Sequence, residues 1–150
     1  CIEVAILRDG AYLTEDDNGV ALFFKSENKA SIIPLIKAYI RLGTRCIGWG
    51  RAPTIIWKEF QISKHRLNIS HFHFWMLAVE NQKFGLKTII SIRDFVFLLS
   101  DSEGIPILAE TRIKKNRKVY ERYGFECYDS WKPKSEKFPV WFLHRKAQDY

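Results

Sequence analysis

The pattern of apolar and polar positions in the second half of the chain predicts strands alternating with helices. Residues 71–79 form a continuous aromatic and aliphatic run with the length of a buried strand. Residues 88–99 place their apolar side chains at spacings that fit one buried face of a helix. A turn at 101–104 precedes a β-favouring run at 105–111, which predicts a buried parallel strand. The predicted order is strand, glycine-containing loop, helix, strand, helix, strand.

The first half predicts short strands followed by two helices. Residues 2–7, 11–13 and 20–25 are apolar runs separated by Asp-Gly and Asn-Gly turn signals, so we predict strands there. Residues 30–42 and 52–62 each carry a helical apolar face, and such faces most often pack in a core.

The end of the chain predicts an antiparallel hairpin that closes the sheet. Residues 125–131 and 140–145 alternate aromatic with polar positions, and the polar stretch 132–137 connects them. Together with the preceding elements, this predicts one α/β (α+β) domain over residues 1–150. A chain of this size can bury roughly 68–70% of its unfolded surface.

Composition narrows the function classes. Hydrophobic residues at 47% and charged residues at 27% are ordinary for a globular protein, whereas aromatics at 15% are high and cluster in the predicted strands. The net charge of +7 could suggest nucleic acid, but no helix-turn-helix, zinc-finger or RNA-binding signature accompanies it. A polyanionic cofactor would be a sufficient partner for part of this charge.

The cysteines and the apolar runs indicate a compartment and exclude a membrane span. Cys1, Cys46 and Cys127 are widely spaced and show no metal-ligand pattern, so we expect no metal and a reduced, cytoplasmic protein. No apolar run reaches the roughly 18 residues that a membrane span needs, so no membrane partner is expected.

Residues 116–125 carry the most informative pattern in the chain. Asn116 and Tyr120 stand four residues apart and would share one helical face, Gly124 would end the helix, and Phe125 would open a strand. Such a face suits the wall of a cofactor site, although an amphipathic helix whose tyrosines only pack gives the same pattern. The pattern resembles the last helix of the GNAT superfamily of N-acetyltransferases.

The loop before the long helix extends this resemblance. A glycine-containing loop that leads into a helix can hold a phosphate with backbone N–H groups and the helix dipole. In the GNAT superfamily this loop reads Gln or Arg, two residues, Gly, one residue, then Gly or Ala, and it cradles the coenzyme A pyrophosphate. Gln82 and Gly85 match, but Lys87 replaces the small residue, so it would either obstruct the phosphate or add positive charge. The loop is also about two residues shorter than is usual in that family.

The resemblance is specific over residues 71–145 and implies the rest of the fold. It implies a mixed, mostly antiparallel twisted sheet flanked by helices, in which the first strand and two helices of the family are absent before Cys1. We therefore expect an N-terminally incomplete domain. Helical segments at the position of 52–62 border the acceptor cleft in this superfamily, so Trp57 and Phe60 become candidate substrate contacts.

The activity implied by the resemblance is transfer of an acetyl group from acetyl-CoA to a primary amine by direct attack. Tyr120 stands where the family places the general acid for the departing sulfur, or else its phenol only packs. Asn116 would hydrogen-bond the coenzyme A arm, or else cap the helix. The backbone of 77–79 would pair with the pantetheine arm. The predicted cofactor-binding residues are Leu77, Ala78, Val79, Gln82, Lys83, Phe84, Gly85, Leu86, Lys87, Thr88, Asn116 and Tyr120.

The sequence leaves three candidates for the general base, namely two residues and a water molecule. Strand alternation would place His73 on one face with His71, Trp75, Leu77 and Val79. A histidine there could titrate near neutrality and relay the amine proton through water. Glu110, at the end of the next strand, is a comparable candidate, and members of the superfamily also manage with water alone.

Two other function classes stay open. Lys87 and the short loop also suit a catalytically silent acyl-CoA-binding or regulatory module. Net charge alone favours a basic nucleic-acid-binding protein, for which residues 64–66 would be a contact unless they form a solvated turn. The sequence does not specify the acceptor amine, because fold does not fix function. A homodimer is possible, but the sequence does not specify the oligomeric state.

Overall fold

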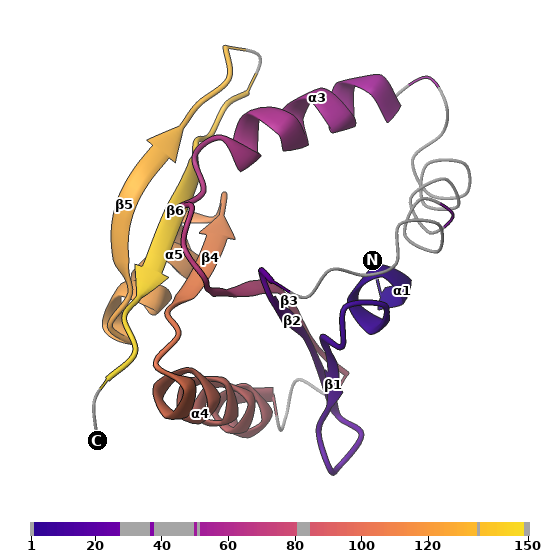
Figure 1. The fold of residues 1–150 in the computed structure, drawn as a ribbon, viewed down its shortest axis with the longest axis vertical. Coiled ribbons are helices and arrows are strands. Elements are labelled where there is room, and N and C mark those ends of the chain that lie inside the picture. Colours follow the sequence, from indigo (N-terminus) through magenta and orange to yellow (C-terminus); the bar gives the residue numbers. More distant parts are fainter. Residues whose placement is uncertain are drawn as a thin grey trace.

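The fold is built on a six-stranded sheet with the strand order β1-β2-β3-β4-β6-β5. The computed structural model describes residues 2–27, 37, 50, 52–80, 85–134 and 136–148. All neighbouring strands are antiparallel except β3 and β4, which are parallel. This arrangement confirms the predicted mixed, mostly antiparallel sheet (Figure 1). The strands are β1 (Ala11–Leu13), β2 (Gly19–Lys25), β3 (Phe72–Val79), β4 (Ile107–Thr111), β5 (Glu126–Trp131) and β6 (Val140–Arg145).

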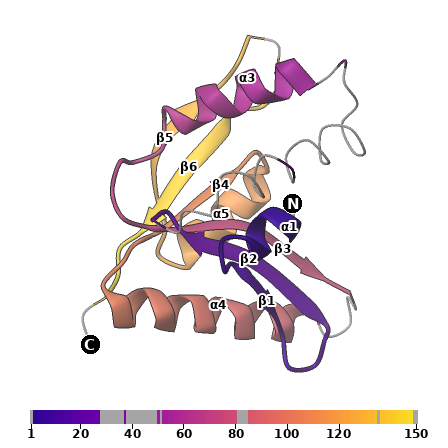
Figure 2. The ribbon, with the colours of Figure 1, turned by 45° about the vertical axis from the view of Figure 1, so that its right-hand side comes forward.

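Helices lie on both sides of the sheet. Those described are α1 (Ile2–Ile6), α3 (Ala52–Ser63), α4 (Gly85–Glu103) and α5 (Lys114–Arg122). Figure 2 shows α4 on one side of β1–β3, with α1 and α3 on the other. Within the described residues, none of these helices combines the length and the apolarity that a bilayer span requires.

The main core lies on the sheet face that packs against α4 and α5, here called the α4 face. Its buried side chains come from four strands, β2, β3, β4 and β6, from α4, and from Phe125, which immediately precedes β5. Burial of these side chains is the main favourable term in the folding free energy. The buried members are Ala21, Phe23, Phe72, Ile92, Val96, Ile107, Ala109, Phe125 and Leu143.

A smaller core lies on the opposite face, here called the α3 face. Ile62 of α3 packs there on Val140 and Phe142 of β6, with Tyr128 and Trp131 of β5 beside them. This small cluster fixes the C-terminal end of α3 against the β5–β6 hairpin, and that hairpin is confirmed as predicted.

Two predictions from the first half of the chain were wrong. The segment predicted as a strand at 2–7 instead forms the helix α1 (Ile2–Ile6), with Val4 and Ala5 buried. A short apolar run has no clear period, so burial beside β2 decides its conformation. The helix α3 forms where predicted, but of its apolar residues Ile62 packs in a core, whereas Ile55, Ile56, Trp57 and Phe60 are exposed.

The remaining boundaries differ from the predictions by a few residues. The strands expected at 11–13, 20–25, 105–111 and 140–145 are present. The turn expected at 101–104 begins later, because α4 continues to Glu103 and ends at Gly104, whose φ of 66° suits glycine. The helix expected at 30–42 lies outside the described residues except for Lys37.

Candidate functional site

Strands β3 and β4 separate in the middle of the sheet. Leu22 of β2 pairs with Met76, but the next residue of β2 pairs with Phe74, so Trp75 is a bulge in β3. A bulge bends its strand and increases the local twist. The pairing of β3 with β4 covers Phe72 to Phe74 and ends at Ala109, after which β4 continues beside β6. Figure 2 shows the two strands running apart beyond this point.

The bulge also changes which face each residue of β3 occupies. Leu77 packs against the core of the α4 face, as Phe74 does. The prediction that Leu77 shares a face with His73 was therefore wrong, because regular alternation stops at Trp75.

Backbone polar groups of β3 point into the gap between the diverging strands. Glu80 donates its backbone N–H to Asn18, with an N···O distance of 2.9 Å, so residue 80 faces β2. In an antiparallel pair, successive residues direct their N–H and C=O groups alternately to the two neighbours. The backbone N–H and C=O groups of Ala78 therefore also point toward β2. Those of Leu77 and Val79 point to the opposite edge of β3, where β4 no longer pairs with it.

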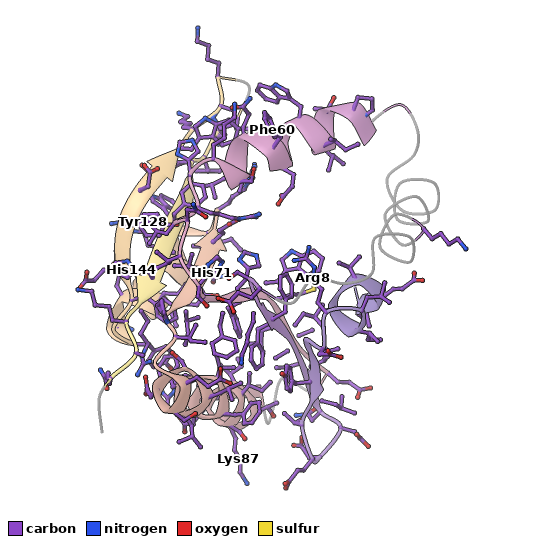
Figure 3. The ribbon with its side chains drawn as sticks, in the orientation of Figure 1. Arg8, Phe60, His71, Lys87, Tyr128 and His144 are labelled. Carbon is purple, nitrogen blue, oxygen red and sulfur yellow. The ribbon has the colours of Figure 1, made fainter. Side chains whose placement is uncertain are left out.

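The first turn of α4 lies next to the end of β3. Gly85 is buried, and a Cβ there would stand 3.6 Å from Val79 Cγ1. The first N–H groups of a helix lack intrahelical acceptors and carry the positive end of its dipole. The Lys87 side chain extends away from the sheet (Figure 3), so it does not enter the gap. Thr88 is buried, and its Oγ1 accepts a hydrogen bond from Asn18 Nδ2 at 3.0 Å. The other predicted loop residues, Gln82, Lys83 and Phe84, lie outside the described residues.

The helix α5 carries Asn116 and Tyr120, as predicted. It begins at Lys114 with Ile113 as its N-cap, so Asn116 does not cap it. Tyr120 is half-buried against the main core, its ring centroid 5.1 Å from that of Phe125. Burial raises the pKa of the Tyr120 phenol, which therefore keeps its proton at neutral pH. Packing and proton donation are compatible at this position.

His73 does not fit a base that titrates near neutrality. It is 7% exposed on the α3 face, and burial lowers its pKa to about 3, with Arg66 and His71 adding to the effect. His71, labelled in Figure 3, is also buried, and its Nδ1 donates to the carbonyl of Ile69 at 2.7 Å. Burial lowers the pKa of His71 as well, so both imidazoles are neutral at physiological pH.

Glu110 lies immediately beyond the point where β3 and β4 separate, and Arg66 holds it there. Arg66 Nε donates to Glu110 Oε1 at 2.5 Å, and Nη2 approaches Oε2 at 3.3 Å. Nη2 also donates to Glu59 at 2.8 Å. Burial disfavours the guanidinium charge, but Glu110 and Glu59 outweigh it and raise the pKa of Arg66. The carboxylate of Glu110 is thus fixed in position beside the gap.

A histidine–aspartate pair that the sequence did not reveal lies on the same face. The Nδ1 of His65 is 2.7 Å from Asp129 Oδ2, and since a carboxylate only accepts, Nδ1 is the donor. This bond lowers the pKa of Asp129. The ring of His65 stacks on Phe142, which is the neighbour of Glu110 in the sheet. The prediction of a solvated basic turn at 64–66 was therefore wrong for His65 and Arg66.

A second bulge explains how this pair forms. Cys127 pairs with Leu143 and Asp129 with Phe142, so Tyr128 is the extra residue in β5. Tyr128 and Asp129 consequently both reach the α3 face. Burial raises the pKa of Tyr128 to about 12, and the charge of Glu110 adds to the shift. The described residues hold no cluster of three or more metal-ligating side chains.

Solved structures share this fold at low sequence identity. A Corynebacterium glutamicum protein described as histone acetyltransferase HPA2 and related acetyltransferase has a TM-score of 0.59 and 10% identity, with 93% of this chain and 64% of that chain covered. The C-terminal condensation domain of Ebony, in complex with beta-alanyl-dopamine, has a TM-score of 0.59 and 10% identity, with 96% and 75% covered. No protein-family model and no curated protein matches the chain.

These likenesses establish the fold. The chain has the mixed α/β fold of GNAT acetyltransferases, as its sequence predicted. It spans slightly less than two thirds of the length of the Corynebacterium protein.

Proposed function

We propose that the chain, acting as a single domain, is an N-acyltransferase that moves an acetyl group from acetyl-CoA to a primary amine. The observation that carries this proposal is the separation of β3 and β4 beyond Phe74, with the backbone of Leu77 and Val79 directed into the gap. An extended amide-containing arm can pair with such an exposed strand edge. The likeness to acetyltransferases and to a condensation domain supports acyl transfer.

The residues around the gap fit coenzyme A. The pantetheine arm carries amides that match the polar groups of Leu77 and Val79. The N-terminus of α4, beginning at Gly85, offers backbone donors and a positive dipole for the pyrophosphate. Lys87 points outward and adds positive charge near that helix end without filling the gap. Acetyl-CoA supplies an acetyl thioester, whose carbonyl carbon a neutral amine can attack.

Tyr120 is proposed as the general acid. As the new N–C bond forms and the C–S bond breaks, the departing sulfur takes the phenolic proton. The raised pKa of Tyr120 keeps that proton in place until the sulfur needs it. Asn116, one turn earlier on the same helix, would hydrogen-bond the coenzyme A arm.

Glu110 is proposed as the group that receives the amine proton, directly or through water. It lies at the point of strand separation, and Arg66 fixes its orientation. Each carboxylate oxygen can accept more than one hydrogen bond, so the contact with Arg66 leaves acceptor capacity. His73 is a weaker candidate, because burial keeps its pKa near 3. The acceptor class is not specified by these residues.

Calorimetric titration of acetyl-CoA into the wild-type chain and a Tyr120→Phe variant tests the proposal. Saturable binding to both is expected, because the phenol acts in the chemical step and packs through its ring. Release of free thiol in the presence of a panel of amines should then fall about 100-fold or more in the Tyr120→Phe variant. Tyr123→Phe is the matched control on the same helix and should keep full turnover.

The alternatives give different results in the same assays. Binding without thiol release from any amine would indicate a silent acyl-CoA-binding module. Absence of binding to the folded chain would contradict the proposal altogether. A salt-sensitive shift with oligonucleotides, without acetyl-CoA binding, would instead support a nucleic-acid-binding protein.

A further inference from the structure

Except for Ile62, the helix α3 turns its apolar side chains away from the sheet. Pro53, Ile56, Trp57 and Phe60 follow the i, i+3, i+4, i+7 spacing of one helical stripe. Ile56 is 67% exposed, Trp57 52% and Phe60 58%. The less exposed positions of the helix include the polar Lys58 and Gln61, and Lys58 pairs with Glu136 of the hairpin. A helix that folds only to cover a sheet would have the opposite orientation.

Lysines lie at the end of this apolar stripe and on the neighbouring hairpin. Lys64 lies at the end of the stripe, with Nζ 4.4 Å from the centre of the Phe60 ring. The connection between β5 and β6 adds Lys132, Lys134 and Lys137, the last of which lies over the exposed ring of Phe138. Among the described ion pairs, these four lysines have no acidic partner.

The helix and the hairpin form one continuous surface. A hollow of about 440 Å³ between them is lined by Trp57, Gln61, Trp131, Lys132, Pro133 and Lys134. Trp57 and Trp131 meet across it, with ring centroids 6.4 Å apart. We call the stripe of α3 together with the lysines and Phe138 of the hairpin the basic apolar surface.

We propose that the basic apolar surface docks on an anionic lipid bilayer, with α3 lying in the plane of the interface. Helices that bind in this way combine an exposed stripe of aliphatic and aromatic residues with flanking lysines. The apolar side chains would enter the boundary between headgroups and acyl chains, while the lysines meet anionic headgroups. Peripheral docking needs no spanning segment, so it departs from the expectation of no membrane partner.

The aliphatic member of the stripe favours a bilayer over single-stranded nucleic acid. Bases stack on aromatic rings, which Trp57 and Phe60 could provide, but Ile56 would gain little from such stacking. Ile56 lies in the same exposed stripe as Trp57 and Phe60, so only an apolar partner would bury all of these side chains. Because these lysines have no acidic partner among the described ion pairs, an anionic partner suits the surface better than a neutral one.

Co-sedimentation with vesicles tests the proposal. The wild-type chain should bind phosphatidylcholine vesicles that contain roughly one-third phosphatidylserine, and bind pure phosphatidylcholine vesicles far more weakly. Raised salt should weaken the binding. Phe60→Ser should lower the affinity about tenfold or more, because it removes a buried ring from the bound state. Lys132→Gln with Lys134→Gln should lower it roughly 25-fold, about fivefold for each lysine.

Matched changes elsewhere serve as controls. Leu98→Ser removes a comparably exposed apolar side chain from α4, and Lys118→Gln with Lys115→Gln removes two exposed lysines from α5. Both should bind vesicles like the wild type. Circular dichroism and a thermal melt confirm that each variant is folded.

Several results would overturn the proposal. No vesicle binding, or equal binding to neutral and anionic vesicles, would exclude an anionic bilayer as the partner. If the α5 lysine control loses as much binding as the hairpin lysine variant, net charge and not this surface causes the binding. Preferential binding of a single-stranded oligonucleotide that competes with vesicles, or dimerisation abolished by Phe60→Ser without lipid binding, would assign the surface to that partner instead.

Discussion

Replacing Asp101 by Asn is expected to destabilise the fold strongly, because Asp101 neutralises a buried arginine. Arg145 is 5% exposed and the side chain of Asp101 is 3% exposed. Two parallel hydrogen bonds join them, Nη1 to Oδ1 at 2.7 Å and Nη2 to Oδ2 at 2.9 Å. The backbone N–H of Gln148 donates to the same carboxylate at 2.9 Å, and the guanidinium lies 4.0 Å above the centre of the Phe97 ring. This pair joins the end of α4 to the end of β6.

The expected loss follows from leaving the guanidinium without its counter-charge. Removing one partner of a buried ion pair costs about 3–5 kcal/mol of unfolding free energy. Asn has the size of Asp, so no cavity adds to this loss. For a chain of 150 residues the loss corresponds to a fall of roughly 6–20 °C in Tm. Urea unfolding followed by circular dichroism would measure the free energy.

The pH dependence gives a second signature of the same pair. Hydrogen bonds from Arg145 lower the pKa of Asp101 in the folded chain. The stabilisation is therefore fully present above the unfolded pKa of about 3.9 and is lost as the pH falls through the folded value. The free-energy difference between the wild type and Asp101→Asn should be constant above about pH 5 and shrink below about pH 4.

The control is Glu121→Gln, which changes the net charge by the same amount. Glu121 forms a half-exposed ion pair with Arg117 at 2.7 Å, four residues earlier on α5. Its loss should cost about 0.5 kcal/mol or less. If Asp101→Asn costs less than about 1 kcal/mol, or no more than Glu121→Gln, the reasoning about burial is refuted.

Three further changes test other parts of the structure. Gly10→Ala should cost about 1–3 kcal/mol in urea unfolding, because its Cβ would lie 2.5 Å from the carbonyl oxygen of Phe23, whereas Gly50→Ala, with nothing within 4 Å, should cost far less. His73→Gln should leave the apparent pKa values of the kcat/KM profile unchanged, since His73 is already neutral above pH 5; loss of one limb would contradict this. Deleting Trp75 should restore regular pairing of β3 and weaken acetyl-CoA binding about tenfold or more in a folded chain, while Trp75→Phe should not; unchanged affinity after the deletion would mean that the bulge does not create the gap.

Periodicity predicted the elements that carry their own signal. The strand at 72–79, the helix at 85–103 and the hairpin of β5 and β6 have lengths and patterns that few alternatives share. The segment 2–6 has too few residues to show a period, and burial of Val4 and Ala5 decides its conformation. The stripe of α3 was visible, but its direction was not, because a pattern does not say whether an apolar face meets the sheet or another partner.

In the candidate site, too, the sequence indicated the features made by neighbouring residues and not those made by residues far apart in the chain. Asn116, Tyr120 and Gly124 lie within a few residues of one another, so the sequence could indicate that they belong to one helix and its end. The pair of His65 with Asp129 joins residues 64 positions apart, and that of Arg66 with Glu110 joins residues 44 apart. Such pairs depend on the topology of the whole sheet. A basic turn gives the same local signal whether it is solvated or, as here, paired with carboxylates on two strands.

The two bulges show why the sequence could not predict the geometry of the site. Neither Trp75 nor Tyr128 has a glycine or proline beside it in its strand, so no local signal marks an irregularity. Packing on either side specifies the bulge at Trp75: Phe74 and Leu77 both meet the main core, and they can do so only if the strand holds an extra residue between them. The bulge therefore keeps apolar burial on both sides of the irregularity while it turns the edge of β3 away from β4. The gap therefore forms while Phe74 and Leu77 both stay packed against the main core.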